Sequence, residues 1–292
     1  MTIADLLCQN TSSRLDAELL LCCALKKPCE YLFAHPEKIL EKKQIAEFYK
    51  FAVRRAKGEP VAYLTGKKEF FGLDFFVNCD VLIPRPETEL LVELVLKQMR
   101  CAISDTRYAT IIDVGTGSGN IIIAIFKNLS TGARKKVFLY GTDISDSALR
   151  VARKNAKRHE AEKKIKFIKS DLLKYFIDKK YFRAGNIIVV ANLPYVSSKL
   201  YETNQRNLKF EPKTALISEN KGLEYYTRLT REIREICAVR RALCVTGLFE
   251  ISPEQKRLIN DIIRKILPEA KIEFFRDLAG KWRVVKITAG KK

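Results

Sequence analysis

The chain has little of what metal centres and membrane spans require. It contains only two histidines, His35 and His159, and none of its eight cysteines follows a C-x-x-C spacing, so we expect no metal site. No apolar run approaches the ~18 residues that a bilayer-spanning helix needs. Residues 1–10 lack the basic and apolar segments of a secretory signal. These absences predict a protein of the reducing cytoplasm that contacts no membrane.

Positive charge is in excess. The 292 residues carry 54 Lys and Arg against 34 Asp and Glu, a formal net charge of +20, while 47% are hydrophobic and 30% charged, as in globular proteins. Such an excess favours acidic partners, either nucleic acid or an acidic protein face. It is equally compatible with a Lys-rich, solvated surface. Contact with nucleic acid therefore fits the charge without being required by it.

The first part of the chain has helical patterns only. Leu15, Leu19, Leu20 and Cys23 recur at helical spacing, and Ser12 or Ser13 is placed to cap that helix. A second helix is expected over 43–57, ending at Gly58. Its expected inner face consists of Ile45, Phe48, Phe51, Ala52 and Val53. These patterns predict a small helical domain.

Glycines, prolines and aromatic pieces then alternate over 58–86, which predicts a short β-hairpin linking two domains. We place the helical domain at 1–72, the hairpin linker at 73–86 and the second domain at 87–292.

Strand and helix patterns alternate from residue 110 onward. Strands are predicted over 110–114, 137–142, 165–168, 186–191 and 242–251, with helices over 120–128, 145–158, 223–237 and 253–267. This alternation predicts an α/β domain with a mostly parallel sheet covered by helices. Two further strand candidates, 271–275 and 283–288, predict an antiparallel edge.

A glycine-rich stretch joins the first strand to its helix. It contains Asp113, Gly115, Thr116, Gly117, Ser118 and Gly119. Glycines permit a tight turn, and the helix N-terminus offers N–H groups to an anion. The dinucleotide fingerprint is not met, because Asn120 stands where it needs a glycine or alanine. The spacing resembles the S-adenosylmethionine site of Rossmann-like methyltransferases, where the helix faces the methionine carboxylate. A purely structural turn is the alternative.

Acids follow the next two strands. Asp143 is placed to accept the ribose hydroxyls of a nucleoside, although it could instead cap the following helix. Asp171 is placed to accept the adenine amino group while Leu172 packs on the ring; a simple turn is the alternative. The ribose role of Asp143 and the adenine role of Asp171 and Leu172 assign these residues to the same cofactor.

The run that ends the fourth strand is Asn192, Leu193, Pro194 and Tyr195. This tetrapeptide resembles that of methyltransferases acting on planar nitrogens, namely adenine amino groups and glutamine amides. Such a nitrogen is a poor nucleophile because its lone pair is delocalised. Hydrogen bonds from its N–H groups to the Asn192 oxygen and the Leu193 carbonyl would orient that lone pair toward the cofactor methyl, with Tyr195 packing on the plane. Asn192 is therefore expected to contact substrate and cofactor. A structural strand-end turn is the alternative.

Segments outside this tetrapeptide resemble the release-factor glutamine methyltransferases over nearly the whole chain. They read DAELL at 16–20, GEPVAYLTG at 58–66, EF at 69–70, VLIPRPETE at 81–89, FEP at 210–212, AL at 215–216, GL at 222–223, DLAGK at 277–281 and RVV at 283–285. Leu193 stands where the family usually has proline, and EISPEQ at 250–255 departs from the family's Glu-x-Gly-x-x-Gln pattern.

This resemblance implies an enzyme that uses S-adenosyl-L-methionine and releases S-adenosyl-L-homocysteine. Its substrate would be the glutamine of the Gly-Gly-Gln loop of peptide-chain release factors, held by the helical domain. Arg85, Glu87 and Glu89 would lie near the mouth of the pocket, or else serve helix capping and an interdomain salt bridge. We expect a monomer. The tetrapeptide with Leu193 also resembles rRNA adenine dimethyltransferases, so an adenine N6-methyltransferase of rRNA or DNA is the alternative enzyme, and an inactive translation-associated binding protein is the third reading.

Overall fold

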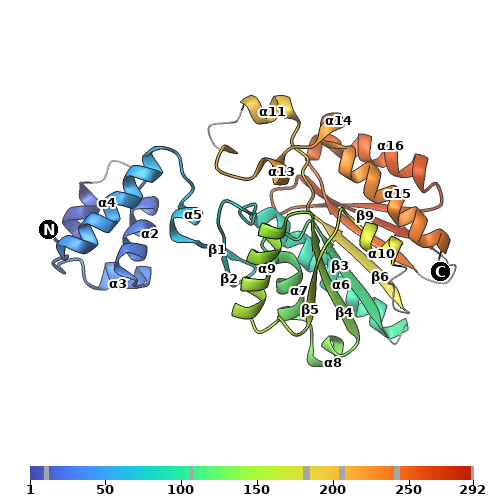
Figure 1. Cartoon of the computed structure of the whole chain (residues 1–292), viewed down its shortest axis with the longest axis horizontal. Helices are drawn as coiled ribbons and strands as arrows, with labels where there is room; N and C mark the ends of the chain where they lie inside the picture. Colours follow the sequence, from blue (N-terminus) through green and yellow to red (C-terminus); the bar gives the residue numbers. More distant parts are fainter. Residues whose placement is uncertain (10–12, 106–107, 180–184, 204–207, 240–243, 291–292) are drawn as a thin grey trace.

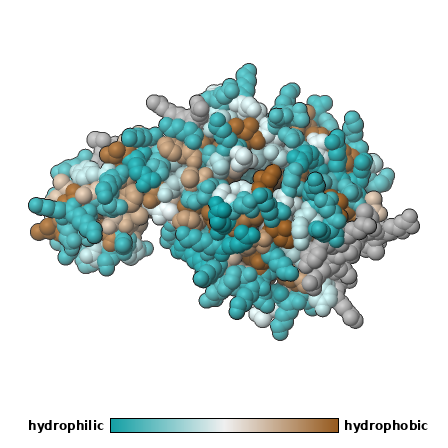
Figure 2. All heavy atoms as spheres, viewed as in Figure 1, coloured by the Kyte–Doolittle hydropathy of each residue, from teal (hydrophilic) through white to brown (hydrophobic). Residues whose placement is uncertain are grey.

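The structure is a computed structural model that describes residues 1–9, 13–105, 108–179, 185–203, 208–239 and 244–290. Ser12 and the first two residues of the strand expected at 242–251 lie outside these residues. A helical part and a larger α/β part lie side by side along the long axis of the molecule (Figure 1). Figure 2 shows hydrophilic side chains over most of the visible face, with apolar atoms gathered near the middle of the α/β part.

Five helices form the helical part: α1 (Ile3–Cys8), α2 (Arg14–Leu25), α3 (Cys29–Ala34), α4 (Lys42–Ala56) and α5 (Val61–Thr65). They share a core of their own that includes Leu6, Leu21 and Phe48. The helical prediction is confirmed, but parts of the expected inner faces are wrong. Leu15 is 63% exposed and Val53 56% exposed, and Leu19 is also exposed, whereas Leu20 and Phe48 are buried.

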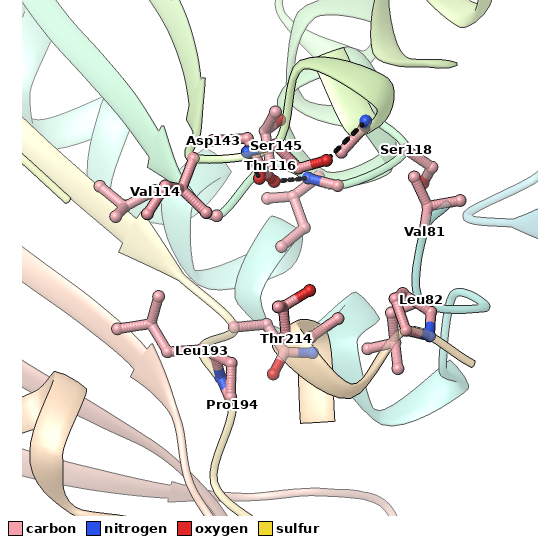
Figure 3. A pocket seen from close by; sticks show the side chains of 18 of the residues that line it. Val81, Leu82, Val114, Thr116, Ser118, Asp143, Ser145, Leu193, Pro194 and Thr214 are labelled. Atoms are coloured by element: carbon pink, nitrogen blue, oxygen red, sulfur yellow. Dashed lines mark hydrogen bonds between the residues drawn. The ribbon is translucent and has the colours of Figure 1, made fainter. Parts of the chain in front are cut away.

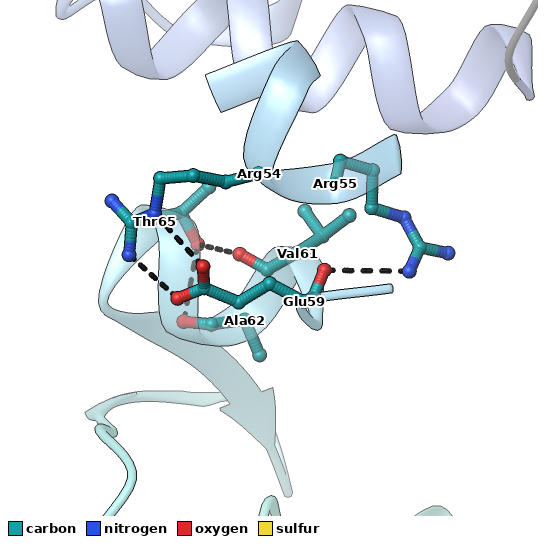
Figure 4. Close-up of polar contacts among 6 residues, drawn as sticks. All are labelled: Arg54, Arg55, Glu59, Val61, Ala62 and Thr65. Atoms are coloured by element: carbon teal, nitrogen blue, oxygen red, sulfur yellow. Dashed lines mark hydrogen bonds and ion pairs between the residues drawn. The ribbon is translucent and has the colours of Figure 1, made fainter. Parts of the chain in front are cut away.

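A polar cluster fixes the turn from α4 to α5 (Figure 4). The guanidinium of Arg54 donates to both carboxylate oxygens of Glu59, at 2.8 and 2.5 Å. Arg55 donates to the Glu59 carbonyl at 3.3 Å, and Thr65 donates to the Val61 carbonyl at 3.0 Å within α5. A two-pronged Arg–carboxylate pair restrains orientation as well as distance, so it holds α5 where the chain leaves the helical part.

The hairpin consists of β1 (Lys67–Phe70) and β2 (Leu73–Phe76), so it begins earlier than the expected 73–86. Its turn falls at Phe71 and Gly72, which both have positive φ. The range predicted from the sequence, 73–86, lies too late because it includes the proline-containing stretch that follows β2. The hairpin is attached to the α/β part: Asn155 bonds both the N–H and the carbonyl of Phe76, at 2.7 and 2.9 Å.

The α/β part is built on one seven-stranded sheet in the order β5-β4-β3-β6-β7-β9-β8. The strands are β3 (Ala109–Val114), β4 (Val137–Asp143), β5 (Ile165–Lys169), β6 (Asn186–Ala191), β7 (Val245–Glu250), β8 (Lys271–Arg276) and β9 (Trp282–Ala289). The first five run parallel, and β9 and β8 are antiparallel. The predicted mostly parallel sheet with an antiparallel edge is confirmed.

Helices cover both faces of the sheet (Figure 1). The short η1 (Pro86–Thr88) leads into α6 (Glu89–Asp105), followed by α7 (Asn120–Asn128), α8 (Thr131–Arg134), α9 (Asp146–Arg158), α10 (Lys174–Asp178), α11 (Ser198–Thr203), α13 (Lys213–Leu216), α14 (Glu219–Gly222), α15 (Glu224–Val239), η2 (Pro253–Gln255) and α16 (Lys256–Ile266). One core lies under α6 and α7, and the other under α10, α15 and α16.

The strand order reverses between β3 and β6, because β4 and β5 follow on one side and β7 on the other. In open α/β sheets, ligands bind outside the carboxyl ends of the strands at such a switch point. Among the described residues, no helix is both long and apolar enough to cross a membrane.

Candidate functional site

A pocket opens at the carboxyl ends of β3, β4 and β6 (Figure 3). Eleven of the residues expected from the sequence line it: Arg85, Gly115, Thr116, Gly117, Ser118, Asp143, Asp171, Leu172, Asn192, Leu193 and Pro194. They come together because Val114 of β3 is in register with Thr142 of β4 and with Ala191 of β6, which ends these strands at one edge.

The glycine loop carries the chain from β3 into α7 in conformations that favour glycine. Gly115, Gly117 and Gly119 have φ values of 71°, 53° and 79°. A Cβ added at Gly115 would lie 3.3 Å from Leu193 Cδ2, and one at Gly119 would lie 3.3 Å from Ala152 Cβ. Gly115 thus keeps the loop close to the strand-end tetrapeptide. Gly119 packs against α9 and does not line the pocket, contrary to its expected contact with cofactor.

Asp113 lies behind this loop rather than in the pocket. Its side chain is 0% exposed, and its Oδ2 accepts a hydrogen bond of 2.6 Å from Thr116 Oγ1. Burial raises its pKa to about 7, against the lowering effect of the Thr116 hydroxyl. Its Oδ1 has no hydrogen-bond partner among the described residues. Asp113 therefore supports the loop through its bond to Thr116. We expected it to contact the cofactor directly, but it does not line the pocket.

Asp143 lines the pocket and also braces the loop. Its Oδ2 accepts from Gly117 N at 3.0 Å and its Oδ1 accepts from Ser145 N at 2.9 Å. Burial raises its pKa, opposed by these N–H donors. Ser145 caps α9, since its hydroxyl accepts from Ala148 N at 3.2 Å. The helix cap is thus supplied by Ser145, while Asp143 lines the pocket.

Asp171 and Leu172 line the pocket after β5. Asp171 Oδ2 accepts from Arg228 Nη2 at 2.5 Å, and Arg228 of α15 lines the pocket too. Sequence reasoning missed Arg228 because it lies within a helix and in no motif. Leu172 has a φ of 51°, unusual for a side chain of its size, and offers an apolar surface to the pocket.

Asn192 follows β6 directly, and its Nδ2 donates to Thr88 Oγ1 at 3.0 Å. Leu193 is only 3% exposed and reaches toward the glycine loop, while Pro194 lines the pocket. Tyr195 does not line it, contrary to expectation. Its ring packs against the core under α15, and Gln255 donates to its carbonyl at 3.3 Å. Gly222 lies so close to this carbonyl that a Cβ would collide with it.

Of the charged residues expected near the pocket mouth, Arg85 and Glu89 make contacts within the protein. Arg85 lines the pocket and pairs with Glu211, with 2.5 Å between Nη2 and Oε1. Glu89 accepts from Phe71 N at 2.9 Å and so ties the hairpin turn to α6. Glu87 is exposed, and neither glutamate lines the pocket. This arrangement favours the capping and interdomain role over substrate contact for Glu89.

Several further pocket residues were not among the site residues predicted from the sequence. They are Asp80, Val81, Leu82, Pro84, Thr88, Val114, Asn120, Ile121, Ile144, Ser145, Ala148, Ser170, Pro212, Thr214, Ala215, Tyr225 and Arg228. Thr88 and Pro84 lie within the VLIPRPETE segment, whose resemblance to the family could have pointed to them.

The donor set suits S-adenosylmethionine. Loop N–H groups and the start of α7 suit a carboxylate, Asp143 suits ribose hydroxyls, and Leu172 and Ile144 offer apolar faces to an adenine ring. Among the described residues, no group of three His, Cys, Asp or Glu side chains could hold a metal ion.

Two parts of the chain match protein families. Residues 2–66 match the PrmC N-terminal domain, and residues 105–257 match the family described as Methyltransferase domain. A release factor glutamine methyltransferase of Dictyoglomus turgidum is 33% identical over 276 residues, covering 94% of this chain and 91% of the relative. That of Koribacter versatilis is 40% identical and covers 77% and 75%, and that of Bacillus subtilis is 33% identical and covers 92% and 89%.

Solved structures share the fold. The hMettl16 catalytic domain in complex with an MAT2A 3'UTR hairpin has a TM-score of 0.54 and 17% identity, covering 79% of this chain and 80% of that one. The N-terminal domain of human METTL16 in complex with SAH has a TM-score of 0.51 and 16% identity, covering 74% and 76%. At such identities the likeness shows the α/β methyltransferase fold alone.

Proposed function

The chain belongs to the release factor glutamine methyltransferase family, and we propose that its target is the glutamine amide of the Gly-Gly-Gln loop of peptide-chain release factors. The reaction transfers a methyl group from S-adenosyl-L-methionine to the side-chain N5. Bound cofactor supplies an activated methyl on a sulfonium, so the protein has mainly to hold the acceptor nitrogen in line with it.

The observation that carries the proposal is the placement of Asn192. Its amide directly follows β6, lines the pocket, and donates to Thr88 Oγ1 at 3.0 Å. With Nδ2 bonded to Thr88, the Oδ1 atom is left to accept an N–H of the substrate amide. The Leu193 carbonyl would accept the second N–H, which needs no particular side chain and tolerates leucine in place of proline.

The buried surroundings of this edge fit an uncharged substrate group. Leu193 is buried and Pro194 and Thr214 lie nearby around the same opening (Figure 3). An amide entering here loses water, so its N–H groups gain from fixed acceptors more than they would in solution. Tyr195 lies behind the opening, and we assign it to holding the tetrapeptide rather than to stacking on the substrate.

We propose that residues 1–72 bind the release factor while the α/β part carries out the transfer. The separate core of the helices supports a distinct recognition unit, and Tyr63 of α5 donates at 2.6 Å to the carbonyl of Val81, which lines the pocket. We further propose that the enzyme works as a monomer in the cytoplasm, where peptide-chain release takes place.

Methylation with labelled cofactor tests the proposal. Purified enzyme is incubated with a release factor, with the same factor whose loop glutamine is replaced by alanine, and with ribosomal RNA. We expect label on the intact factor only. Equal labelling of the alanine variant refutes the glutamine assignment, and methylated adenine in the RNA without label on the factor establishes the adenine N6 reading that Leu193 and the +20 charge leave open. Cofactor binding without any transfer identifies an inactive binding protein.

A further inference from the structure

A chain of hydrogen bonds runs from Asn192 into the interior. Asn192 Nδ2 donates to Thr88 Oγ1 at 3.0 Å, and Thr88 Oγ1 donates to Glu250 Oε2 at 2.7 Å. Thr88 is 2% exposed and Glu250 is 1% exposed. The three side chains come from the end of β6, from η1 and from the end of β7, so the tertiary fold alone brings them together.

The chemistry of these groups gives the chain a direction. A carboxylate only accepts hydrogen bonds, whereas a threonine hydroxyl has one proton to donate and two lone pairs. Because Thr88 donates its proton to Glu250, it can only accept from Asn192. The amide of Asn192 therefore turns its NH₂ group toward Thr88 and its oxygen the other way. Oδ1 accepts no hydrogen bond among the described residues, and Asn192 lines the pocket.

We propose that Glu250 and Thr88 are positioning residues that fix which end of the Asn192 amide faces the substrate. A reversed amide would present its NH₂ group to the NH₂ group of the acceptor, so that donor would meet donor. The two ends of an amide have nearly the same shape, so packing alone does not choose between them, whereas the carboxylate does. This inference rests on the proposed function, in which Asn192 accepts an N–H from the substrate.

The surroundings of Glu250 make the direction depend on pH. Burial raises its pKa to about 7, while the Thr88 hydroxyl, Arg283 of β9 and the Tyr195 hydroxyl lower it and Glu87 of η1 raises it. Tyr226 donates to the main-chain carbonyl of Glu250 at 2.6 Å and so bonds its backbone, not its carboxyl group. Once protonated, the carboxyl can itself donate to Thr88, and the hydroxyl is then free to point at Asn192. The direction is thus enforced above pH 7 and is lost as the pH falls below it.

Three substitutions separate the effect of the Asn192 amide direction from the effect of side-chain packing. Thr88→Val keeps the shape of the side chain without the hydroxyl, Thr88→Ser keeps the hydroxyl, and Glu250→Gln keeps the shape without the charge. Thr230→Val is the matched control, because Thr230 is 1% exposed and its hydroxyl donates at 2.6 Å to the Tyr226 carbonyl in α15. Steady-state turnover with a release factor and the dissociation constant for cofactor are measured for each.

We expect Thr88→Val and Glu250→Gln to lower kcat about 10- to 100-fold at pH 8, with cofactor affinity within about threefold of wild type. Thr88→Ser and Thr230→Val should stay within about threefold of wild type in kcat. Retained cofactor binding shows that the variants are folded. Wild-type kcat in both Thr88→Val and Glu250→Gln overturns the inference.

The pH profile gives a second readout, which a merely structural role would not move. The ratio of wild-type to Glu250→Gln turnover should fall toward one as the pH is lowered through about 7, because protonated Glu250 resembles glutamine. A ratio that stays constant between pH 6 and 8 contradicts the assignment to Glu250. Failure of the wild-type enzyme to methylate any release factor refutes the proposed function instead, so the two failures are distinguishable.

Discussion

Replacement of Asn192 by alanine removes the proposed substrate acceptor while leaving the glycine loop and Asp143 in place. Among the described residues, the side chain makes one hydrogen bond, of 3.0 Å to Thr88 Oγ1, and Thr88 keeps its bond to Glu250 without it. Loss of one net hydrogen bond costs about 1 kcal/mol of folding free energy, which lowers Tm by about 2–4 °C in a domain of this size. The fold should therefore survive the substitution.

The effect on the reaction should be much larger. Removal of one fixed polar group that orients the reacting atoms costs about 2.7–4 kcal/mol, or about 100- to 1,000-fold in kcat. Cofactor affinity should change by no more than a few fold, because the loop and Asp143 carry most of that binding. Single-turnover transfer of a labelled methyl measures the first quantity and calorimetry the second.

Asn128→Ala is the matched control for this substitution. Asn128 is an exposed amide that donates to the Ala124 carbonyl at 2.9 Å at the end of α7, and it does not line the pocket. It should lose a similar small amount of stability and no activity. Turnover of Asn192→Ala at the wild-type rate refutes the orientation of the substrate by this amide.

Three further outcomes are expected. Asp143→Asn should weaken cofactor binding about 10- to 100-fold, because the amide of asparagine has one acceptor oxygen where the carboxylate has two. Asp146→Asn, which changes an exposed acid in the same region, should leave the calorimetric affinity for cofactor unchanged. Gly119→Ala should lower stability in a urea titration by about 1–3 kcal/mol, because its φ is 79° and its Cβ would be crowded, and Gly132→Ala, in open space, should not. Glu89→Ala should lower stability by about 1–2 kcal/mol through loss of its bond to the hairpin backbone while kcat stays near wild type; a large loss of kcat at unchanged stability would restore the substrate-contact role.

The strand ends and the glycine loop were predictable from the sequence because their placement follows from local pattern and one general property of parallel sheets. Alternating strands and helices predict the sheet, and the carboxyl ends of neighbouring parallel strands meet at one edge. Asp143 and Asn192 directly follow predicted strands, Asp171 lies three residues after one, and all three line the pocket. The pattern leaves open only how many residues past the end of its strand each of these side chains lies.

The supporting contacts were not predictable in this way. Thr88 and Glu250 are 162 residues apart in the chain, and no spacing rule relates an η1 hydroxyl to the end of β7. Arg228 reaches Asp171 from the middle of a helix. The direction of a side chain after a strand end is equally hidden: Pro194 lines the pocket, yet Tyr195, the next residue, packs against the core.

Helical spacing identified an apolar face on α2 but not how much of it is covered. The contacts between α2 and α4 include the 2.7 Å ion pair between Arg55 and Asp16, which lie 39 positions apart. In this packing Leu20 and Leu21 are buried, whereas Leu15 is exposed to solvent. Helical periodicity predicts that an apolar stripe runs along α2. Which side of that stripe is buried depends on the helices that pack against it.

Localisation of the transferred methyl group tests the account most directly. A release factor treated with enzyme and S-adenosyl-L-methionine is digested, and the peptide that contains the Gly-Gly-Gln loop is sequenced by tandem mass spectrometry. The account predicts the mass of one methyl group on the glutamine side chain, present with wild-type enzyme and nearly absent with Asn192→Ala. A methyl group on any other residue, or equal modification by both enzymes, would contradict it.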